Sequence, residues 1–168
     1  KTVGGFALRT DAHTITCQSL VIATGGLSIP KIGASRFGYD IAKQFGLPVT
    51  AVKPALVPLT FQDEFLQRCR ALSGLSVDAE VRYGKTVFRE GLLFTHRGLS
   101  GPSILQISSY WDEGQALEID LLPDIDVTTM LKARKSETPR QDVLTALADC
   151  LPRRLAADIL DELSVSGR

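Results

Sequence analysis

The chain has 168 residues, enough for one good-sized domain or two small ones. It is 44% apolar and 23% charged, with 14 glycines and 8 prolines, which argues against a disordered chain, a collagen-like repeat or a coiled coil. Nineteen basic residues balance nineteen acidic ones, so no overall electric field favours nucleic acid or an anionic membrane.

The three cysteines, Cys17, Cys69 and Cys150, lie too far apart for a zinc spacing. One of them is left over from any disulfide pair, which favours a reduced, cytoplasmic protein. No apolar run reaches the roughly 20 residues of a membrane span, and no signal peptide opens the chain. We therefore expect a neutral cytoplasmic protein of mixed class with no membrane partner.

The first third of the chain mixes strands with one helix. Residues 5–10 alternate, residues 11–13 turn and residues 14–17 continue, which predicts a hairpin. The apolar run 19–24 is typical of a strand buried on both faces in a parallel sheet, with a buried helix turn as the less favoured alternative. A helix is predicted over 36–45, because its apolar residues fall four apart.

A domain boundary is expected near Lys53. Prolines at 48, 54 and 58 break the following stretch into extended pieces, as in a linker. The predicted domains are residues 1–53 and 54–168.

The second domain predicts a small antiparallel sheet and then helices. The expected elements are a helix from Asp63 to Leu72, strands over 76–83 and 86–95 joined by Gly84-Lys85, a helix from Pro102 to Tyr110 and a strand over 116–122. The tail predicts helices over 126–135, 138–151 and 152–163, the second opened by a capping box of Thr138 and Gln141 with Pro139 in its first turn. The fold class is α+β, barrel-like over 54–123 and helical over 124–168.

The first candidate site follows the buried-type strand. Ala23, Thr24, Gly25 and Gly26 would bring bare backbone to the carboxyl edge of a sheet, where dinucleotides bind. A tight turn after a core strand explains the same residues.

The second candidate site opens the helix that follows. Backbone amides near Ser35 and Gly38 could face a phosphate or a flavin carbonyl. A helix simply capped by Ser35 is the alternative.

The third candidate, residues 94–102, has the sequence FTHRGLSGP and is the densest polar cluster in the chain. It is expected to join a strand end to a helix start. His96, with helix-start amides near Ser100, could then donate a proton or polarise a carbonyl. A structural loop, with Ser100 as a helix cap, explains it equally well.

Neither a metal cluster nor a Ser-His-Asp order stands out. The basic residues of the tail alternate with acidic ones, which favours a solvated face over an RNA-binding patch; they are Lys132, Arg134, Lys135, Arg140, Arg153 and Arg154.

Taken together, these segments resemble the BaiN/RdsA (YhiN-type) family of FAD-dependent, NAD(P)-linked flavoproteins. Four stretches carry the resemblance in order: LVIATGGLSIPKIGASRFGYDIAKQFG, PALVPLTF, LLFTHRGLSGPSILQISSYW and IDLLP. The resemblance implies a middle piece of a longer chain, formed by the end of a split, Rossmann-like FAD domain and an inserted cap domain.

The resemblance also implies roles for particular residues. Ala23 to Gly26 match an FAD-contacting turn, and Ser35, Gly38 and Tyr39 match the loop and helix that approach the flavin. The residues that match the motif facing the catalytic cleft are Thr95, His96, Gly98, Ser100, Gly101 and Pro102. Arg36 departs from the glycine common in the family, and Leu47 departs from a histidine.

The function implied is reduction of an activated C=C bond by FAD and NAD(P)H, with a small enone-like molecule or uridine in ribosomal RNA as substrate. His96, assisted by Ser100, is the expected catalytic donor. Two alternatives stay open, an RNA-recognition module without chemistry and a purely structural cap. Expressed alone, the piece is expected to be inactive and to self-associate through the strand at 20–24.

Overall fold

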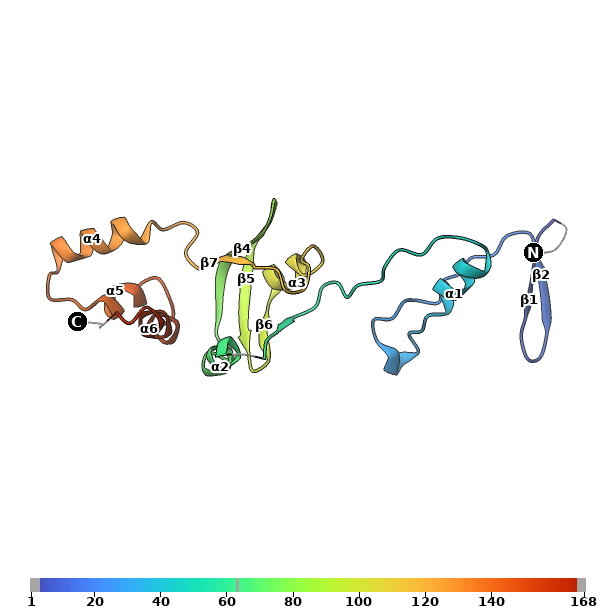
Figure 1. Cartoon of the computed structure of the whole chain (residues 1–168), viewed down its shortest axis with the longest axis horizontal. Coiled ribbons are helices and arrows are strands. Elements are labelled where there is room, and N and C mark those ends of the chain that lie inside the picture. The colour runs from blue at the N-terminus through green and yellow to red at the C-terminus, as the bar shows by residue number, and fades with distance from the viewer. Residues whose placement is uncertain (1–3, 63, 166–168) are drawn as a thin grey trace. The chain divides into compact units, whose positions relative to one another are not determined.

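The computed structural model describes residues 4–62 and 64–165 and divides into two compact units, residues 1–53 and 54–168 (Figure 1). The predicted helix cap at Asp63 lies outside the described residues. Each unit has its own secondary structure, and the two differ in how much they bury.

The first unit contains one hairpin and one helix. Strands β1 (Phe6–Arg9) and β2 (Thr14–Cys17) pair antiparallel, and α1 spans Phe37–Gln44 after a short 3-10 helix at Pro30–Ile32. The predicted hairpin and helix are confirmed. Phe6 of β1 and Phe45 at the end of α1 pack edge to face, with ring centroids 6.0 Å apart.

The predicted strand over 19–24 is wrong. Residues 18–26 form no regular structure, and the Val21 side chain is 84% exposed. A strand of a parallel sheet obtains its hydrogen bonds from neighbouring strands. Within residues 4–53 the described strands, β1 and β2, pair with each other, and neither provides an edge for this run.

The second unit is built on a five-stranded antiparallel sheet in the order β3-β6-β5-β4-β7. The strands are β3 (Leu59–Thr60), β4 (Ser76–Tyr83), β5 (Thr86–Thr95), β6 (Gly98–Ser100) and β7 (Glu118–Asp120). The predicted hairpin of β4 and β5 is confirmed at both ends, with Tyr83 opposite Thr86. The strand predicted over 116–122 is shorter, because only three of its residues pair with β4.

Five helices accompany this sheet among the described residues. They are α2 (Glu64–Ala71), α3 (Pro102–Ile107), α4 (Val127–Glu137), α5 (Val143–Ala148) and α6 (Arg153–Glu162). The helices predicted over 102–110, 126–135 and 152–163 are confirmed in position as α3, α4 and α6. Helix α3 ends three residues before Tyr110. The α+β class is confirmed by this mixture of helices and an antiparallel sheet.

The capping box predicted at Thr138 is wrong. Thr138 ends α4, where its hydroxyl contacts the Arg134 carbonyl at 3.0 Å and the Gln141 side chain at 2.7 Å. Helix α5 begins only after Asp142, whose carboxylate accepts a hydrogen bond of 2.6 Å from the Thr145 amide. Aspartate is a preferred N-cap residue, so Asp142 caps the helix four residues after the Thr138 start that the Thr-Pro pattern predicts.

The second unit has a hydrophobic core of its own. Its fully buried members come from the sheet and from four helices, and they include Cys69, Val81, Leu92, Leu99, Ile104 and Leu155. No described residue of the first unit is buried to that degree. Residues 54–168 are therefore able to fold independently, whereas residues 4–53 lack a core.

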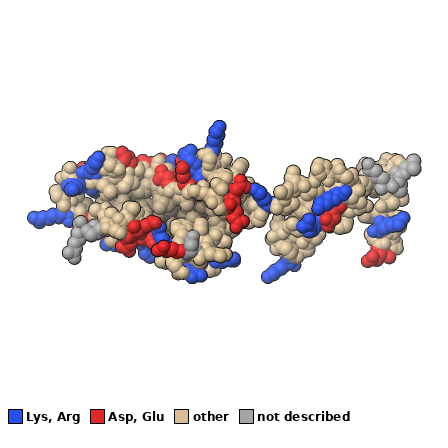
Figure 2. Space-filling view, viewed as in Figure 1, with Lys and Arg blue, Asp and Glu red and all other residues tan. Residues whose placement is uncertain are grey.

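The two units also differ in charge. Residues 54–168 carry 13 basic and 17 acidic side chains, a net charge of −4, and residues 1–53 carry 6 basic and 2 acidic ones, a net charge of +4. Figure 2 shows that both signs are interspersed on the visible face of the second unit. Among the described residues, the visible face of the second unit therefore has no broad basic surface.

Candidate functional site

The FTHRGLSGP motif forms a strand, a two-residue turn and a second strand. Thr95 ends β5 and pairs with Gly98 of β6, leaving His96 and Arg97 at the turn. The Thr95 hydroxyl donates to the Gly98 carbonyl at 3.0 Å and accepts from the Arg97 amide at 3.2 Å. These bonds hold the turn closed, and the His96 side chain is exposed at its tip.

This geometry corrects the expectation that the motif joins a strand end directly to a helix start. Strand β6 intervenes, and its residue Ser100 pairs with Leu93 of β5. Ser100 lies two residues beyond Gly98, a distance of about 7 Å at the usual rise of a strand. Helix α3 starts at Pro102 after Gly101, with no side-chain cap. Ser100 is therefore not the predicted cap, and helix-start amides do not surround His96.

The glycines of the motif have a structural reason. A Cβ at Gly98 would collide with the Leu59 carbonyl oxygen of β3 and would stand 2.9 Å from the Phe61 ring. A Cβ at Gly101 would stand 2.5 Å from the Gly91 carbonyl oxygen. Both residues also have positive φ, 142° and 95°, which favours glycine. They let three backbone segments approach one another around the turn.

Two arginines contact or belong to this turn, and a third contacts the end of α2 next to it. Arg70, in the last turn of α2, donates from Nε to the His96 carbonyl at 3.4 Å. Arg154, in the first turn of α6, donates from Nη2 to the Ala71 carbonyl at 2.9 Å. With Arg97 in the turn itself, they form what we call the arginine cluster: Arg70, Arg97 and Arg154.

Sequence reasoning missed this cluster. Its members are spread over 85 positions of the chain, and Arg154 was interpreted as part of a solvated helical face. Only the packing of α2 against β5 and β6, and the bonds from Arg154 to the end of α2, relate them to one another, and no local pattern carries that information.

In the first unit, the structure brings together most of the predicted cofactor-contacting residues. A Cβ at Gly38 would lie 3.4 Å from Thr24 Oγ1, and a Cβ at Gly26 would lie 3.3 Å from Tyr39 Oη. The turn at 23–26 thus lies against the start of α1. Ala23, Thr24 and Gly25 are exposed, and Gly25 has φ +72° with open space around it.

Ser35 stands just before this helix. Its hydroxyl accepts a long hydrogen bond, 3.4 Å, from the Phe37 amide, although the helix itself begins after Arg36. The simple capping interpretation of Ser35 therefore has only a weak bond in its support.

Within the described ranges, no three or more His, Cys, Asp or Glu side chains are grouped so that they could hold a metal ion. The helices found in those ranges are also too short or too polar to cross a membrane.

The sheet and the tail define a class of protein in which a barrel-type antiparallel sheet is followed by a helical subdomain. A family described as "HI0933-like protein barrel and H2TH domain" matches residues 53–167. The chain belongs to this HI0933-like family, which confirms the family resemblance carried by the four sequence stretches.

Among similar proteins, the ribosomal RNA dihydrouridine synthase of Escherichia coli is 50% identical over 90% of this chain, and that of Haemophilus influenzae is 44% identical over 89%. The 3-dehydro-bile acid delta(4,6)-reductase of Clostridium scindens is 25% identical over 94%. These matches cover 38%, 37% and 41% of the relatives' own lengths, so the chain spans about two fifths of the proteins it resembles.

Proposed function

We propose that this chain is part of a flavin-dependent reductase that converts uridine in ribosomal RNA to dihydrouridine. The observation that carries the proposal is 50% identity to a ribosomal RNA dihydrouridine synthase across 90% of the chain. The bile-acid reductase relative is half as similar, and its name also describes a reductase. Reduction is therefore common to these relatives, and the higher identity favours RNA as the substrate.

The reaction adds two electrons and two protons across the C5=C6 bond of uridine. A hydride and a proton account for this change, and NADH or NADPH is the proposed source of the electrons. FAD, when bound, would accept hydride from the nicotinamide and deliver it to the substrate.

The residues of the first unit fit one wall of an FAD site. Residues Ala23–Gly25 are exposed, which admits close approach, and the hydroxyls of Thr24 and Tyr39 lie next to Gly38 and Gly26, respectively. We propose that Ala23 to Gly26, with Ser35, Gly38 and Tyr39, contact this cofactor. Residues 1–53 would then belong to a split FAD domain, and residues 54–168 to a domain inserted in it.

His96 is the proposed proton donor. Its side chain is exposed on a turn held closed by the Thr95 hydroxyl, so the imidazole is both accessible and fixed at its base. Ser100 has a positioning role in this proposal, because its pairing with Leu93 fixes the strand that carries the turn. A general acid of this kind contributes roughly 10²–10⁴-fold to a rate.

Neither alternative has an observation that favours it over the reductase. An RNA-recognition module without chemistry does not account for the reductase named among the relatives. A purely structural cap leaves the exposed imidazole without a role. A ribosomal RNA substrate would place the protein in the cytoplasm.

The test uses the complete gene product that contains this chain. It is incubated with reduced nicotinamide and with protein-free ribosomal RNA from cells that lack the gene, and dihydrouridine is measured by mass spectrometry of the nucleosides. The proposal predicts dihydrouridine in the RNA and oxidation of an equal amount of nicotinamide. Reduction of a steroid enone without any change in the RNA would contradict it.

A further inference from the structure

The arginine cluster has three cationic side chains, carried by the end of α2, the β5–β6 turn and the start of α6. The link from Arg70 Nε to the His96 carbonyl ties α2 to the turn, and the links from Arg154 Nη2 to the Ala71 and Ser73 carbonyls, at 2.9 and 3.3 Å, tie α6 to the end of α2. All three arginines are exposed. Arg70 therefore contacts the turn that carries His96, Arg97 lies in that turn, and Arg154 contacts the end of α2 next to Arg70.

Carboxylates do not neutralise this cluster among the residues that the structure describes. None of the ion pairs found there uses Arg70, Arg97 or Arg154. Two of the three carboxylates that follow Arg154 along α6, Asp158 and Glu162, are held by Arg68, at 2.7 and 2.5 Å. In a unit with net charge −4, this concentration of unpaired guanidinium groups is a local exception.

We propose that the arginine cluster binds backbone phosphates of a ribosomal RNA strand and thereby places a uridine beside His96. This inference rests on the proposed function. Guanidinium groups match phosphate oxygens with two parallel hydrogen bonds. Phosphate contacts fix the position of a nucleic acid strand without reading its sequence, which suits a site that must present one base to a donor.

A single dinucleotide is a poorer match for the same cluster. Its pyrophosphate is usually held by backbone amides at a helix N-terminus. Here the cations come from the end of α2, a strand turn and α6, and each side chain is exposed. Three separated cations suit successive phosphates along a strand.

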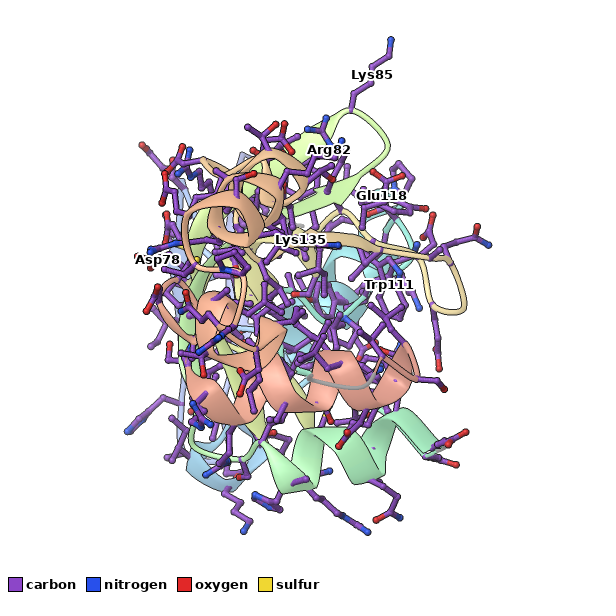
Figure 3. All side chains as sticks on the ribbon, turned by 90° about the vertical axis from the view of Figure 1, so that its left-hand side faces the viewer. Asp78, Arg82, Lys85, Trp111, Glu118 and Lys135 are labelled. Atoms are coloured by element: carbon purple, nitrogen blue, oxygen red, sulfur yellow. The ribbon has the colours of Figure 1, made fainter. Side chains whose placement is uncertain are left out.

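The test compares two double variants of equal charge change in the complete gene product. Arg70→Gln with Arg97→Gln removes two cluster charges and leaves the Arg154 bonds in place. The matched control, Lys85→Gln with Lys135→Gln, removes two exposed charges from the β4–β5 turn and from α4 (Figure 3). Lys85 lies at the opposite end of the ten-residue strand β5 from Arg97.

The readout is equilibrium binding of protein-free ribosomal RNA over a series of salt concentrations. We expect the cluster variant to raise Kd about tenfold or more, because hydrogen bonds to charged groups are lost. We also expect the slope of log K against log salt to shrink by about 1.4, from two lost single-strand phosphate contacts. The control is expected to change Kd less than threefold.

Equal effects of the two variants, or no effect of the cluster variant, would overturn the inference. So would a raised KM for the nicotinamide with an unchanged Kd for RNA, because the cluster would then bind a dinucleotide. If the wild-type protein forms no dihydrouridine but the cluster variant alone loses RNA affinity, the inference stands and the proposed function fails. If dihydrouridine forms equally well in both variants and both bind RNA normally, the proposed function stands and the inference about the arginine cluster fails.

Discussion

Arg68 of α2 and Asp158 of α6 form an ion pair that joins the sheet domain to the helical tail, with Arg68 Nη2 2.7 Å and Nε 3.0 Å from the same carboxylate oxygen. Both side chains are partly buried, 26% and 18% exposed, at an apolar cavity of about 120 Å³. Partial desolvation lowers the pKa of Arg68, but hydrogen bonds to Asp158 and Glu162 outweigh it and raise that pKa. The pair therefore holds two segments that are ninety residues apart in the chain.

Removing one partner of this pair should destabilise the second unit. Arg68→Ala leaves Asp158 without its cation in a partly apolar setting, and we expect a loss of about 1–2 kcal/mol in the free energy of unfolding. Arg82→Ala is the matched control, because Arg82 is 45% exposed in its contacts with Glu80 and Glu118, which should be worth less than about 1 kcal/mol. Urea unfolding of residues 54–168 measures both, and equal losses would contradict the linking role of Arg68.

The turn that carries His96 should depend on Gly98. Gly98→Ala places a methyl group against the Leu59 carbonyl and the Phe61 ring, so β3 must separate from β6. We expect a loss of about 2–4 kcal/mol. Gly84→Ala, at the other hairpin turn, meets open space at φ +57° and should cost only about 1 kcal/mol. Thermal unfolding of the two variants separates steric contact from backbone strain, and similar losses would argue against the close approach at Gly98.

The helical tail should lose stability in acid. Asp126 accepts hydrogen bonds from the Thr129 hydroxyl and from the amides of Thr129 and Thr128, and these lower the pKa of Asp126. The Thr145 amide and hydroxyl do the same for the pKa of Asp142.

Because both carboxyl groups bind protons more weakly in the folded state, their contribution is present above their ordinary pKa of about 3.9 and is lost as the pH falls below it. Circular dichroism from pH 6 to pH 2 should show helix loss beginning near pH 4. The Asp126→Asn and Asp142→Asn double variant should show a weaker pH dependence there, and an identical profile would contradict the assignment.

How far the sequence predicted this structure depended on where each segment finds its partners. The β4–β5 hairpin was predicted to the residue because its alternation and its Gly84-Lys85 turn are local signals. The run at 19–24 was misassigned because its strand character needs neighbouring strands that the described chain does not provide. Strand β6 was missed because a three-residue strand that begins with a glycine shows no periodicity, and its pairing depends on β5 and β3.

The candidate site divides in the same way. The residues around His96 and those near Gly26 and Gly38 were singled out from the sequence, whereas the contact of Thr24 with Gly38 and the arginine cluster appear only in the structure. Whether His96 and the residues near Gly26 act on substrate and cofactor stays a prediction.

The 168 residues expressed alone should bind no flavin. Their proposed FAD wall lies in a unit without a buried core, and the sequence contains no glycine-rich turn between a first strand and a helix to hold the pyrophosphate. The purified chain should be colourless. Light scattering should also show that it self-associates, because apolar residues such as Val21 and Ile22 are exposed. A flavin absorbance spectrum with stoichiometric FAD would contradict this expectation.

His96→Ala in the complete gene product should separate the two half-reactions. We expect substrate reduction to slow by about 10²–10⁴-fold, because a general acid is lost, while flavin reduction by the nicotinamide is unchanged. Stopped-flow absorbance of the flavin follows each half-reaction. An unchanged oxidative half-reaction would leave His96 as a structural turn residue.

The most direct measurement of the central claim is the dihydrouridine content of ribosomal RNA in cells that lack the complete gene. Mass spectrometry of nucleosides from the purified ribosomal RNA should show a dihydrouridine present in the parent strain and missing from the deletion strain. The wild-type gene should restore it, and the Arg70→Gln, Arg97→Gln variant should restore less than the Lys85→Gln, Lys135→Gln control. An unchanged dihydrouridine content in the deletion strain would contradict the account.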